Sequence, residues 1–134
     1  MTTKVTIDAH AGWPVRVTRI SGGGRGDETV AANTIQEFHV HDEMDLRIHE
    51  VQPNDGPTIG DKMVGRTFNP SADKRVDHLK ALFAEVIDVM TQMRWDARGD
   101  GAKPSIETVR LASVAITEAQ TAQMWAVKAA TWKD

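Results

Sequence analysis

Apolar positions in the second half of the chain recur at steps of three and four, the period of a helix packed along one face. They form one stripe between residues 76 and 93 and another between residues 109 and 130. Large side chains dominate the first stripe and alanines the second, so the pattern predicts two closely packed helices in an αα-hairpin. The first stripe is Val76, Leu79, Phe83, Val86, Met90 and Met93, and the second is Val109, Ala112, Ile116, Ala119, Gln123, Ala126 and Ala130.

Capping residues set the expected limits of these two helices. Asn69-Pro70 precedes the first helix, and Ser71 is expected to be its N-cap. The segment Gly99-Asp100-Gly101 should end that helix. Ser105 is then the expected N-cap of the second helix, with Glu107 supplying negative charge in its first turn.

A second apolar stripe runs along the last helix, beside the first one. A hairpin covers only one face of each helix, so this stripe needs a further partner. Burying a tryptophan removes on the order of 200 Å² from water, which makes exposure of this stripe costly. We therefore expect a homo-oligomer with the hairpin as its interface; the alternative is that the chain's own sheet covers the stripe. The stripe comprises Leu111, Ala115, Ala122, Trp125, Ala129 and Trp132.

The first fifty residues predict short β-strands. Residues 13–19 alternate apolar and polar side chains, and residues 35–40 and 46–51 are two further candidates. The glycine-rich segment 21–26 is expected to be a hairpin turn. Connections this short favour antiparallel pairing, since parallel strands need long crossovers.

Together these patterns predict an α+β fold, with a small N-terminal antiparallel β-sheet followed by a long C-terminal αα-hairpin that mediates oligomerisation. The expected divisions are a β-rich half over 1–52, a linker rich in proline and glycine over 53–67, and the helical hairpin over 68–134. The length of 134 residues is typical of a single domain, so we expect one compact unit overall.

Composition excludes several classes of function. The net charge of −3 gives no basic field, so DNA is not an expected partner. The chain has no cysteine, which excludes disulfides and thiolate metal sites and fits a reducing compartment. No apolar run approaches the roughly twenty residues that span a bilayer, and residues 1–5 lack the apolar region of a signal peptide. We expect a protein of the cytoplasm, with no membrane partner.

Side chains suited to catalysis are few. The sequence lacks a serine in a nucleophile-elbow setting. His39 and His41 would share one face of a strand, and His49 could join them to bind a metal. Histidines on the solvated face of a sheet explain the same pattern. We therefore expect no catalytic residues, no metal and no cofactor.

An anion site is better supported by the residue pattern. The start of the first helix offers backbone N–H groups and the positive end of a helix dipole, with Arg66 just upstream. Phe68 adds an aromatic face beside Asn69. On the last helix a guanidinium, a hydroxyl and an ammonium fall on or near one face. These are supplied by Arg110, Thr117 and Lys128, with Met124 between them. Taken one at a time, each of these residues is also explained by a structural role, as part of the core or as a solvated side chain on the surface.

Two segments resemble the hairpin domain shared by phage Thoeris anti-defence and anti-CBASS sponge proteins. The resemblance rests on Phe68-Asn69-Pro70-Ser71 with Val76 and Lys80, and on Arg110 followed by residues 115–117 and 124–129, and it spans residues 66–133. The β-rich first half resembles the extra sheet of the Thoeris branch. The longer turn from Arg98 to Lys103 departs from the compact hairpin.

This resemblance implies a non-catalytic phage protein, acting in the cytoplasm of the infected bacterial host, that sequesters a cyclic nucleotide immune messenger. A cyclic ADP-ribose isomer is the first choice and cyclic di- or trinucleotides the second, held between protomers of a hexamer. The expected ligand-binding residues are Arg47, Arg66, Phe68, Asn69, Arg110, Thr117, Trp125 and Lys128. The alternatives are a cyclic-nucleotide phosphodiesterase that uses the histidines, and a structural, oligomerising module that binds protein.

Overall fold

The computed structural model describes residues 1–53, 55–96 and 104–134. The chain divides into two compact units, Met1–Gly56 and Pro57–Asp134. The first unit is built from β-strands and the second from helices, so the predicted α+β class is confirmed. The predicted turn at Gly99-Asp100-Gly101 lies outside the described residues.

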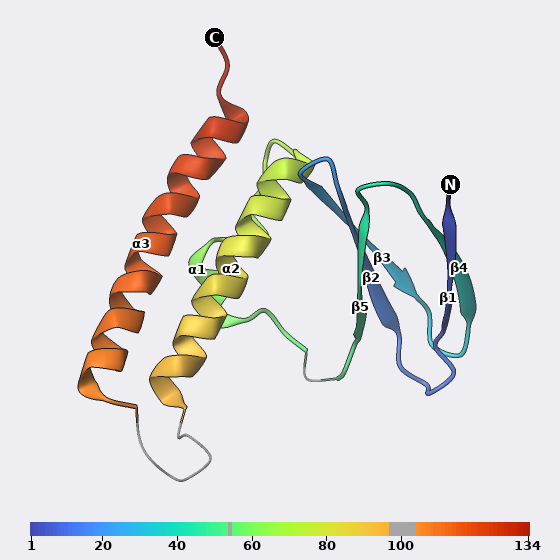
Figure 1. The fold of residues 1–134 in the computed structure, drawn as a ribbon, viewed down its shortest axis with the longest axis horizontal. Helices are drawn as coiled ribbons and strands as arrows, with labels where there is room; N and C mark the ends of the chain where they lie inside the picture. The colour runs from blue at the N-terminus through green and yellow to red at the C-terminus, as the bar shows by residue number, and fades with distance from the viewer. Residues whose placement is uncertain (54, 97–103) are drawn as a thin grey trace. The chain divides into compact units, whose positions relative to one another are not determined.

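In the part of the N-terminal unit that the structure describes there are five strands (Figure 1): β1 (Thr3–Asp8), β2 (Val15–Ser21), β3 (Gly24–Val30), β4 (Ile35–Val40) and β5 (Asp45–Glu50). They make two antiparallel sheets, one with β1 beside β4 and one in the order β3-β2-β5. The prediction located β4 correctly and β2 and β5 approximately. It missed β1 and β3, and it expected one sheet where there are two.

The turn between β2 and β3 explains why β3 was missed. Gly22 and Gly23 have φ values of 57° and 72°, and they join Ser21 to its pairing partner Gly24. Two consecutive residues with positive φ form the tight hairpin turn whose twist matches that of the strands. Gly24 and Gly26 belong to the strand itself, so the turn is shorter than the predicted segment 21–26.

The two sheets contribute to one apolar cluster. Val17 from β2, Val30 from β3 and Phe38 from β4 are almost fully buried in it, and Ile7 from β1 joins them. Arg19 on β2 lies over the Phe38 ring, 5.2 Å from its centroid. The N-terminal unit therefore has a core of its own.

The described residues of the C-terminal unit contain three helices: α1 (Ile59–Met63), α2 (Lys74–Trp95) and α3 (Ile106–Thr131). α2 and α3 lie side by side as an antiparallel hairpin, and α1 packs on α2 (Figure 1). The α1 helix occurs within the segment 53–67 that was expected to be a linker. A capping box at Thr58 starts it, because Thr58 Oγ1 accepts from the Asp61 N–H and Asp61 reaches back to the Thr58 N–H.

Close contact between α1 and α2 depends on Gly60. A Cβ atom built on Gly60 would lie 2.1 Å from the Ala84 carbonyl oxygen. The Gly60 N–H donates to Asp88 Oδ1 at 2.7 Å. Just past α1, Val64 enters the core of the hairpin with Ile87 and Ile116.

Burial confirms the predicted inner stripe of α3 and corrects that of α2. Ala112, Ile116, Ala119 and Gln123 are buried on α3. On α2, Val86 and Met93 are exposed. The α2 helix packs on α1 as well as α3, which rotates its buried face away from the predicted a/d positions. That face comprises Val76, Lys80, Ala81, Ala84, Ile87 and Thr91.

The helix starts differ in how they match the prediction. Ser105 is the N-cap of α3, as predicted, and accepts from the Thr108 N–H. The N-cap of α2 is Asp73, whose carboxylate accepts from the Arg75 N–H, so the prediction of Ser71 was wrong. Among the residues described, no helix is long and apolar enough to cross a membrane.

Candidate functional site

A pocket of about 300 Å³ lies at the end of the hairpin where α2 begins and α3 ends. The segment before α2 supplies one wall, and Val127 and Thr131 of α3 supply the opposite one. Packing of α2 against α3 in antiparallel orientation brings these segments together. The lining consists of Phe68, Asn69, Pro70, Ser71, Val76, Lys80, Val127 and Thr131.

Lys80 is the charged residue of this lining, and it is only 5% exposed. Its ammonium donates to the carbonyl oxygens of Gly65, at 3.0 Å, and Phe68. Burial lowers the pKa of Lys80, against an opposing effect of Asp77. An ammonium has three donors, so two bonds to carbonyls leave capacity for one more. The pocket therefore has a fixed cation in its wall.

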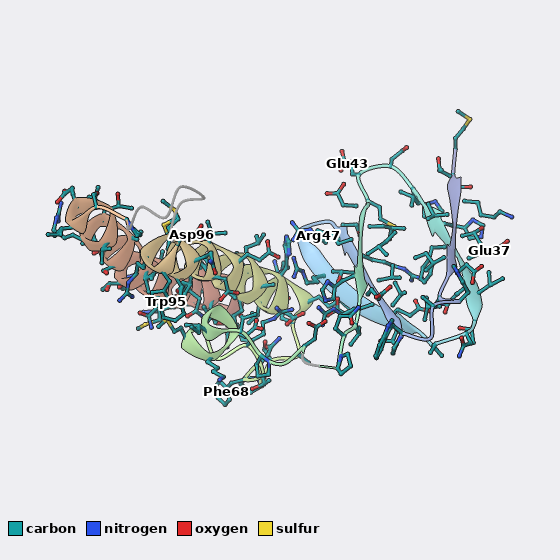
Figure 2. The ribbon with its side chains drawn as sticks, turned by 90° about the horizontal axis from the view of Figure 1, so that it is seen from below. Glu37, Glu43, Arg47, Phe68, Trp95 and Asp96 are labelled. Atoms are coloured by element: carbon teal, nitrogen blue, oxygen red, sulfur yellow. The ribbon has the colours of Figure 1, made fainter. Side chains whose placement is uncertain are left out.

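The Phe68 side chain of the pocket is exposed, with 71% of the residue's surface accessible, and it points outward from the helical unit (Figure 2). Its ring lies over the Lys80 ammonium, with 5.6 Å between Nζ and the ring centroid. A cation at this distance from an aromatic ring is attracted by the ring's quadrupole. The exposed ring offers a flat apolar face suited to stacking.

Asn69 and Ser71 use their side chains to hold the chain in front of α2. Asn69 Nδ2 donates to the Asp73 carbonyl oxygen at 3.0 Å, and Ser71 Oγ donates to Asn69 Oδ1 at 2.7 Å. Ser71 Oγ also accepts from the Asp73 N–H at 3.2 Å. Ala72 has a φ of 54°, which closes the turn. These bonds preorganise the wall of the pocket.

The start of α2 is less open to an anion than its sequence suggests. The Asp73 carboxylate already accepts from the Arg75 N–H and the Arg75 guanidinium. These hydrogen bonds lower the pKa of Asp73 and raise that of Arg75. A ligand phosphate there would have to compete with a negative side chain.

Arg66 is engaged within the helical unit. Its guanidinium lies 3.2 Å from Asp77 of α2 and 3.5 Å from Asp61 of α1. About a quarter of its side chain is exposed. The position ties α1 to α2, and Arg66 is not part of the pocket lining.

Arg110 and Thr117 lie far from this pocket along α3. With a rise of 1.5 Å per residue, Arg110 is about 25 Å and Thr117 about 15 Å along the axis from Val127. Arg110 pairs with Glu107, at 2.6 Å, which raises its pKa and lowers that of Glu107. One chain therefore does not bring Arg110 and Phe68 into a single site.

Trp125 and Lys128 lie near the pocket in height but on another side of α3. The period of the helix places Trp125 about 160° around the axis from Val127. The Lys128 ammonium lies over two tryptophan rings, 5.3 Å from the centroid of Trp125 and 5.9 Å from that of Trp132. Trp125 is 64% exposed.

The remaining candidates belong to the N-terminal unit. Arg47 is exposed on β5 (Figure 2). His39 is on β4 and His49 on β5, which are in different sheets, and His49 Nε2 lies 2.7 Å from Asp55 Oδ2. Within the described ranges, no three histidine or carboxylate side chains are grouped to hold a metal ion.

Sequence reasoning missed Lys80, Val127 and Thr131 as pocket residues. Lys80 had been noted as part of the family resemblance. One signal in the sequence could have identified it: Lys80 follows Val76 by four residues, so both lie on the same, buried face of α2. Val127 and Thr131 required knowledge of which residues before α2 lie opposite the end of α3.

The fold is a helical-hairpin domain with a pocket at the open end of the hairpin. The family described as "Acb2/Tad1, hairpin domain" matches residues 61–131, which is more than half of the chain, and the protein belongs to this family. The family consists of anti-defence domains that bind cyclic nucleotides. No curated protein and no solved structure matches the chain significantly.

Proposed function

We propose that this protein is a phage anti-defence sponge that binds a cyclic nucleotide immune messenger and holds it without cleaving it. The observation that carries the proposal is the pocket of Phe68, Asn69 and Lys80 inside the segment that matches the family. A cyclic ADP-ribose isomer is the preferred ligand, which assigns the protein to the Thoeris branch. Cyclic di- and trinucleotides are the second choice.

The chemistry of the pocket fits such a ligand. A nucleobase stacks on an aromatic ring with about 1–3 kcal/mol, and the Phe68 ring is available for this. The free donor of Lys80 is suited to a phosphate oxygen, since charge-assisted hydrogen bonds are the stronger ones. The lining, as described, includes no carboxylate that would repel a phosphate.

The size of the pocket supports an assembly of several copies. At about 300 Å³ it is at the lower end of the range for small-molecule sites, and it is open to solvent. A messenger with two nucleotide halves needs a larger contact surface than the pocket of one chain provides. We propose a homo-oligomer, a hexamer by the family resemblance, in which a neighbouring copy contributes residues such as Arg110 and Thr117. It acts in the cytoplasm of the infected bacterial host.

The proposal is of a binder and not an enzyme. The phosphodiesterase alternative needs histidines that act together, but His39 and His49 are on different sheets. Sequestration of a scarce messenger requires nanomolar affinity, or about 12 kcal/mol. A stacked base, charge-assisted contacts and a preorganised wall reduce the entropy cost of binding and so favour such affinity.

A ligand panel tests this function. The protein is incubated with cyclic ADP-ribose isomers, cyclic dinucleotides and cyclic trinucleotides, and its melting temperature is measured with each. A ligand that binds only the folded state raises the melting temperature by mass action, so the preferred messenger gives the largest shift. The bound ligand is then released by denaturation and identified by mass spectrometry. Recovery of the intact cyclic compound supports sequestration, whereas cleaved nucleotide or no shift with any compound contradicts it.

A pair of variants tests the pocket itself. Phe68→Ala removes the stacking face and should weaken binding by about 10- to 100-fold, from the energy of one stacked base. Trp95→Ala is the matched control, because Trp95 is similarly exposed but lies at the other end of α2. Titration calorimetry on both variants measures the effect. Equal affinity of Phe68→Ala and the unmodified protein would exclude this pocket as the site.

A further inference from the structure

The chain leaves α1 through a turn that fixes its direction. Gly65 has a φ of 60°, the left-handed conformation that ends many helices and that glycine adopts without strain. The Gly65 N–H donates to the Lys62 carbonyl oxygen at 3.2 Å. The Arg66 N–H donates to the Asp61 carbonyl oxygen at 2.9 Å. These two bonds form a Schellman motif, so α1 itself determines the path of the chain just after it.

The Arg66 side chain adds a second point of attachment at the same place. Its guanidinium lies 3.5 Å from the carboxylate of Asp61 on α1 and 3.2 Å from that of Asp77 on α2. Only 23% of the side chain is exposed, so solvent screens these ion pairs less than those on an open surface. The Asp61 carboxylate also accepts from the Thr58 N–H at 3.1 Å. Arg66 therefore connects the exit from α1 to both ends of α1 and to α2.

This attachment lies next to the pocket in the chain. Thr67 alone separates Arg66 from Phe68, whose ring is the exposed aromatic face of the pocket. The Phe68 N–H donates to the Gly65 carbonyl oxygen at 2.9 Å, which closes a four-residue turn. We call this segment the 65–68 turn. Its two inner residues determine where its last residue points, so a shift of Arg66 moves Phe68.

Lys80 holds the 65–68 turn from another side. Its ammonium donates to the Gly65 carbonyl oxygen at 3.0 Å and to the Phe68 carbonyl oxygen. Lys80 thus fixes the two ends of the turn, whereas Arg66 fixes a residue between them through its side chain. Lys80 lines the pocket and Arg66 does not. A ring mounted on a turn that is held in this way has little freedom left to lose when a ligand binds.

We propose that Arg66 is a positioning residue of the pocket, which acts through Asp61 and Asp77 and not through contact with the ligand. By holding the 65–68 turn, it keeps the Phe68 ring in the orientation that stacks on a base. The inference rests on the proposed function for the ligand itself. Without the guanidinium, the turn has to be ordered again when the ligand binds, which weakens binding.

Fluorine NMR tests the position of the ring without any ligand. The chain has three phenylalanines, so protein labelled with 4-fluorophenylalanine gives three signals, and Phe68→Leu assigns the relevant one. Phe38 lies in the core of the N-terminal unit and Phe83 packs against that of the hairpin, so both report on the rest of the fold. Arg66→Gln should shift or broaden the Phe68 signal and leave the other two in place. An unchanged Phe68 signal, or similar changes in all three, would overturn the inference.

Two further variants make this measurement specific. Asp77→Asn removes the nearer carboxylate but retains Arg66, and it should move the Phe68 signal in the same manner. Arg94→Gln is the matched control, because it replaces an arginine in the last turn of α2, at the end away from the pocket. It should leave all three signals in place. A Phe68 signal that responds to Arg94→Gln as it does to Arg66→Gln would refute the positioning role. Each variant is measured well below its melting temperature.

Ligand affinity tests the consequence for binding. The probe is the cyclic ADP-ribose isomer, cyclic dinucleotide or cyclic trinucleotide that gives the largest melting shift. Titration calorimetry should show about 10-fold weaker binding to Arg66→Gln, and a smaller loss for Asp77→Asn, which keeps the contact with Asp61.

The double variant of Arg66→Gln and Asp77→Asn tests whether the two residues act together. It should bind no more weakly than Arg66→Gln alone, because both changes remove the same contact. A loss equal to the product of the two single effects would show that the residues act separately and would overturn the inference. Affinity of Arg66→Gln equal to that of the unmodified protein would overturn it as well.

The two measurements separate this inference from the proposed function. The fluorine signals are recorded without nucleotide, so they report on the 65–68 turn whether or not a messenger binds. A Phe68 signal that depends on Arg66 in a protein that binds no compound of the panel would contradict the sponge and leave the role of Arg66 in the turn intact. Tight binding with a Phe68 signal that ignores Arg66 would do the reverse.

Discussion

Lys80 Nζ lies 5.6 Å from the centroid of the Phe68 ring, and the same ammonium donates to the Phe68 carbonyl oxygen. One buried cation thus fixes both the backbone and the ring of the residue that is proposed to stack on the ligand. It also accounts for a lysine on the buried face of α2. Stability of the hairpin and binding at the pocket are coupled through this side chain.

Replacing Lys80 with methionine should therefore lower both stability and ligand affinity. The substitution keeps an unbranched side chain, one atom shorter, but leaves the carbonyl oxygens of Gly65 and Phe68 without their donor. We expect a loss of about 1–2 kcal/mol in the free energy of unfolding, from the cost of unpaired buried polar groups. Urea denaturation measures it, with Lys74→Met at the exposed start of α2 as the control. Equal stability of the two variants would contradict the structural role of Lys80.

Gly60 provides a test of how α1 is attached. A Cβ atom at this position would meet the Ala84 backbone, so Gly60→Ala must push α1 away from α2. We expect a destabilisation of about 3 kcal/mol, at the upper end of the cost of overpacking. Gly56→Ala is the matched control, because a Cβ there meets nothing within 4 Å. Thermal unfolding of both variants compares them, and a Gly60→Ala protein as stable as its control would show that α1 does not pack as described.

The sequence predicted those features that one local pattern determines. It did not predict those that depend on packing against several other elements. The inner stripe of α3, from Ala112 to Gln123, was predicted because this face packs mainly on one helix, α2. The buried face of α2 was predicted only in part: Val76 is buried, and Phe83 and Met90 pack against the core, but Val86 and Met93 are exposed. The difference arises because α1 also packs on α2, and nothing in the heptad pattern signals this short helix. Strand β3 was missed since Gly24 and Gly26 have little strand propensity, and pairing with β2 determines their conformation.

The candidate site shows the same limit. Phe68 and Asn69 were predicted as site residues and do line the pocket, since they belong to one continuous segment. Lys80, Val127 and Thr131 join them only through tertiary packing. Arg66 was chosen for its charge and its closeness in sequence, but Asp61 and Asp77 hold it elsewhere. Which cations remain free for a ligand depends on carboxylates that the sequence does not place.

The corrected face of α2 gives a direct prediction from two adjacent residues. Ile87 is fully buried in the core, whereas Val86 is 47% exposed. Ile87→Ala should destabilise the protein by about 3 kcal/mol, through lost burial and the cavity that remains. Val86→Ala should change stability by no more than about 0.5 kcal/mol, as for most surface substitutions. The predicted a/d pattern gives the opposite order, so chemical denaturation of the two variants decides between them.

The N-cap of α2 should make stability of the hairpin depend on acid pH. Hydrogen bonds from Arg75 lower the pKa of Asp73 below its ordinary value of 3.8, so the unfolded chain binds this proton more readily than the folded one. The stabilising contribution is therefore complete above the ordinary pKa and is lost as the pH falls through the lowered value.

Asp73→Asn isolates this contribution, because the amide oxygen can still accept from the Arg75 N–H but does not titrate. The difference in melting temperature between the unmodified protein and Asp73→Asn, followed by the helical signal in circular dichroism, should shrink as the pH falls from about 5 to about 3. Asp73→Ala removes the cap at every pH and should be the least stable of the three near neutrality. A constant difference between the unmodified protein and Asp73→Asn from neutral to acid pH would show that Asp73 does not stabilise α2 through its charge.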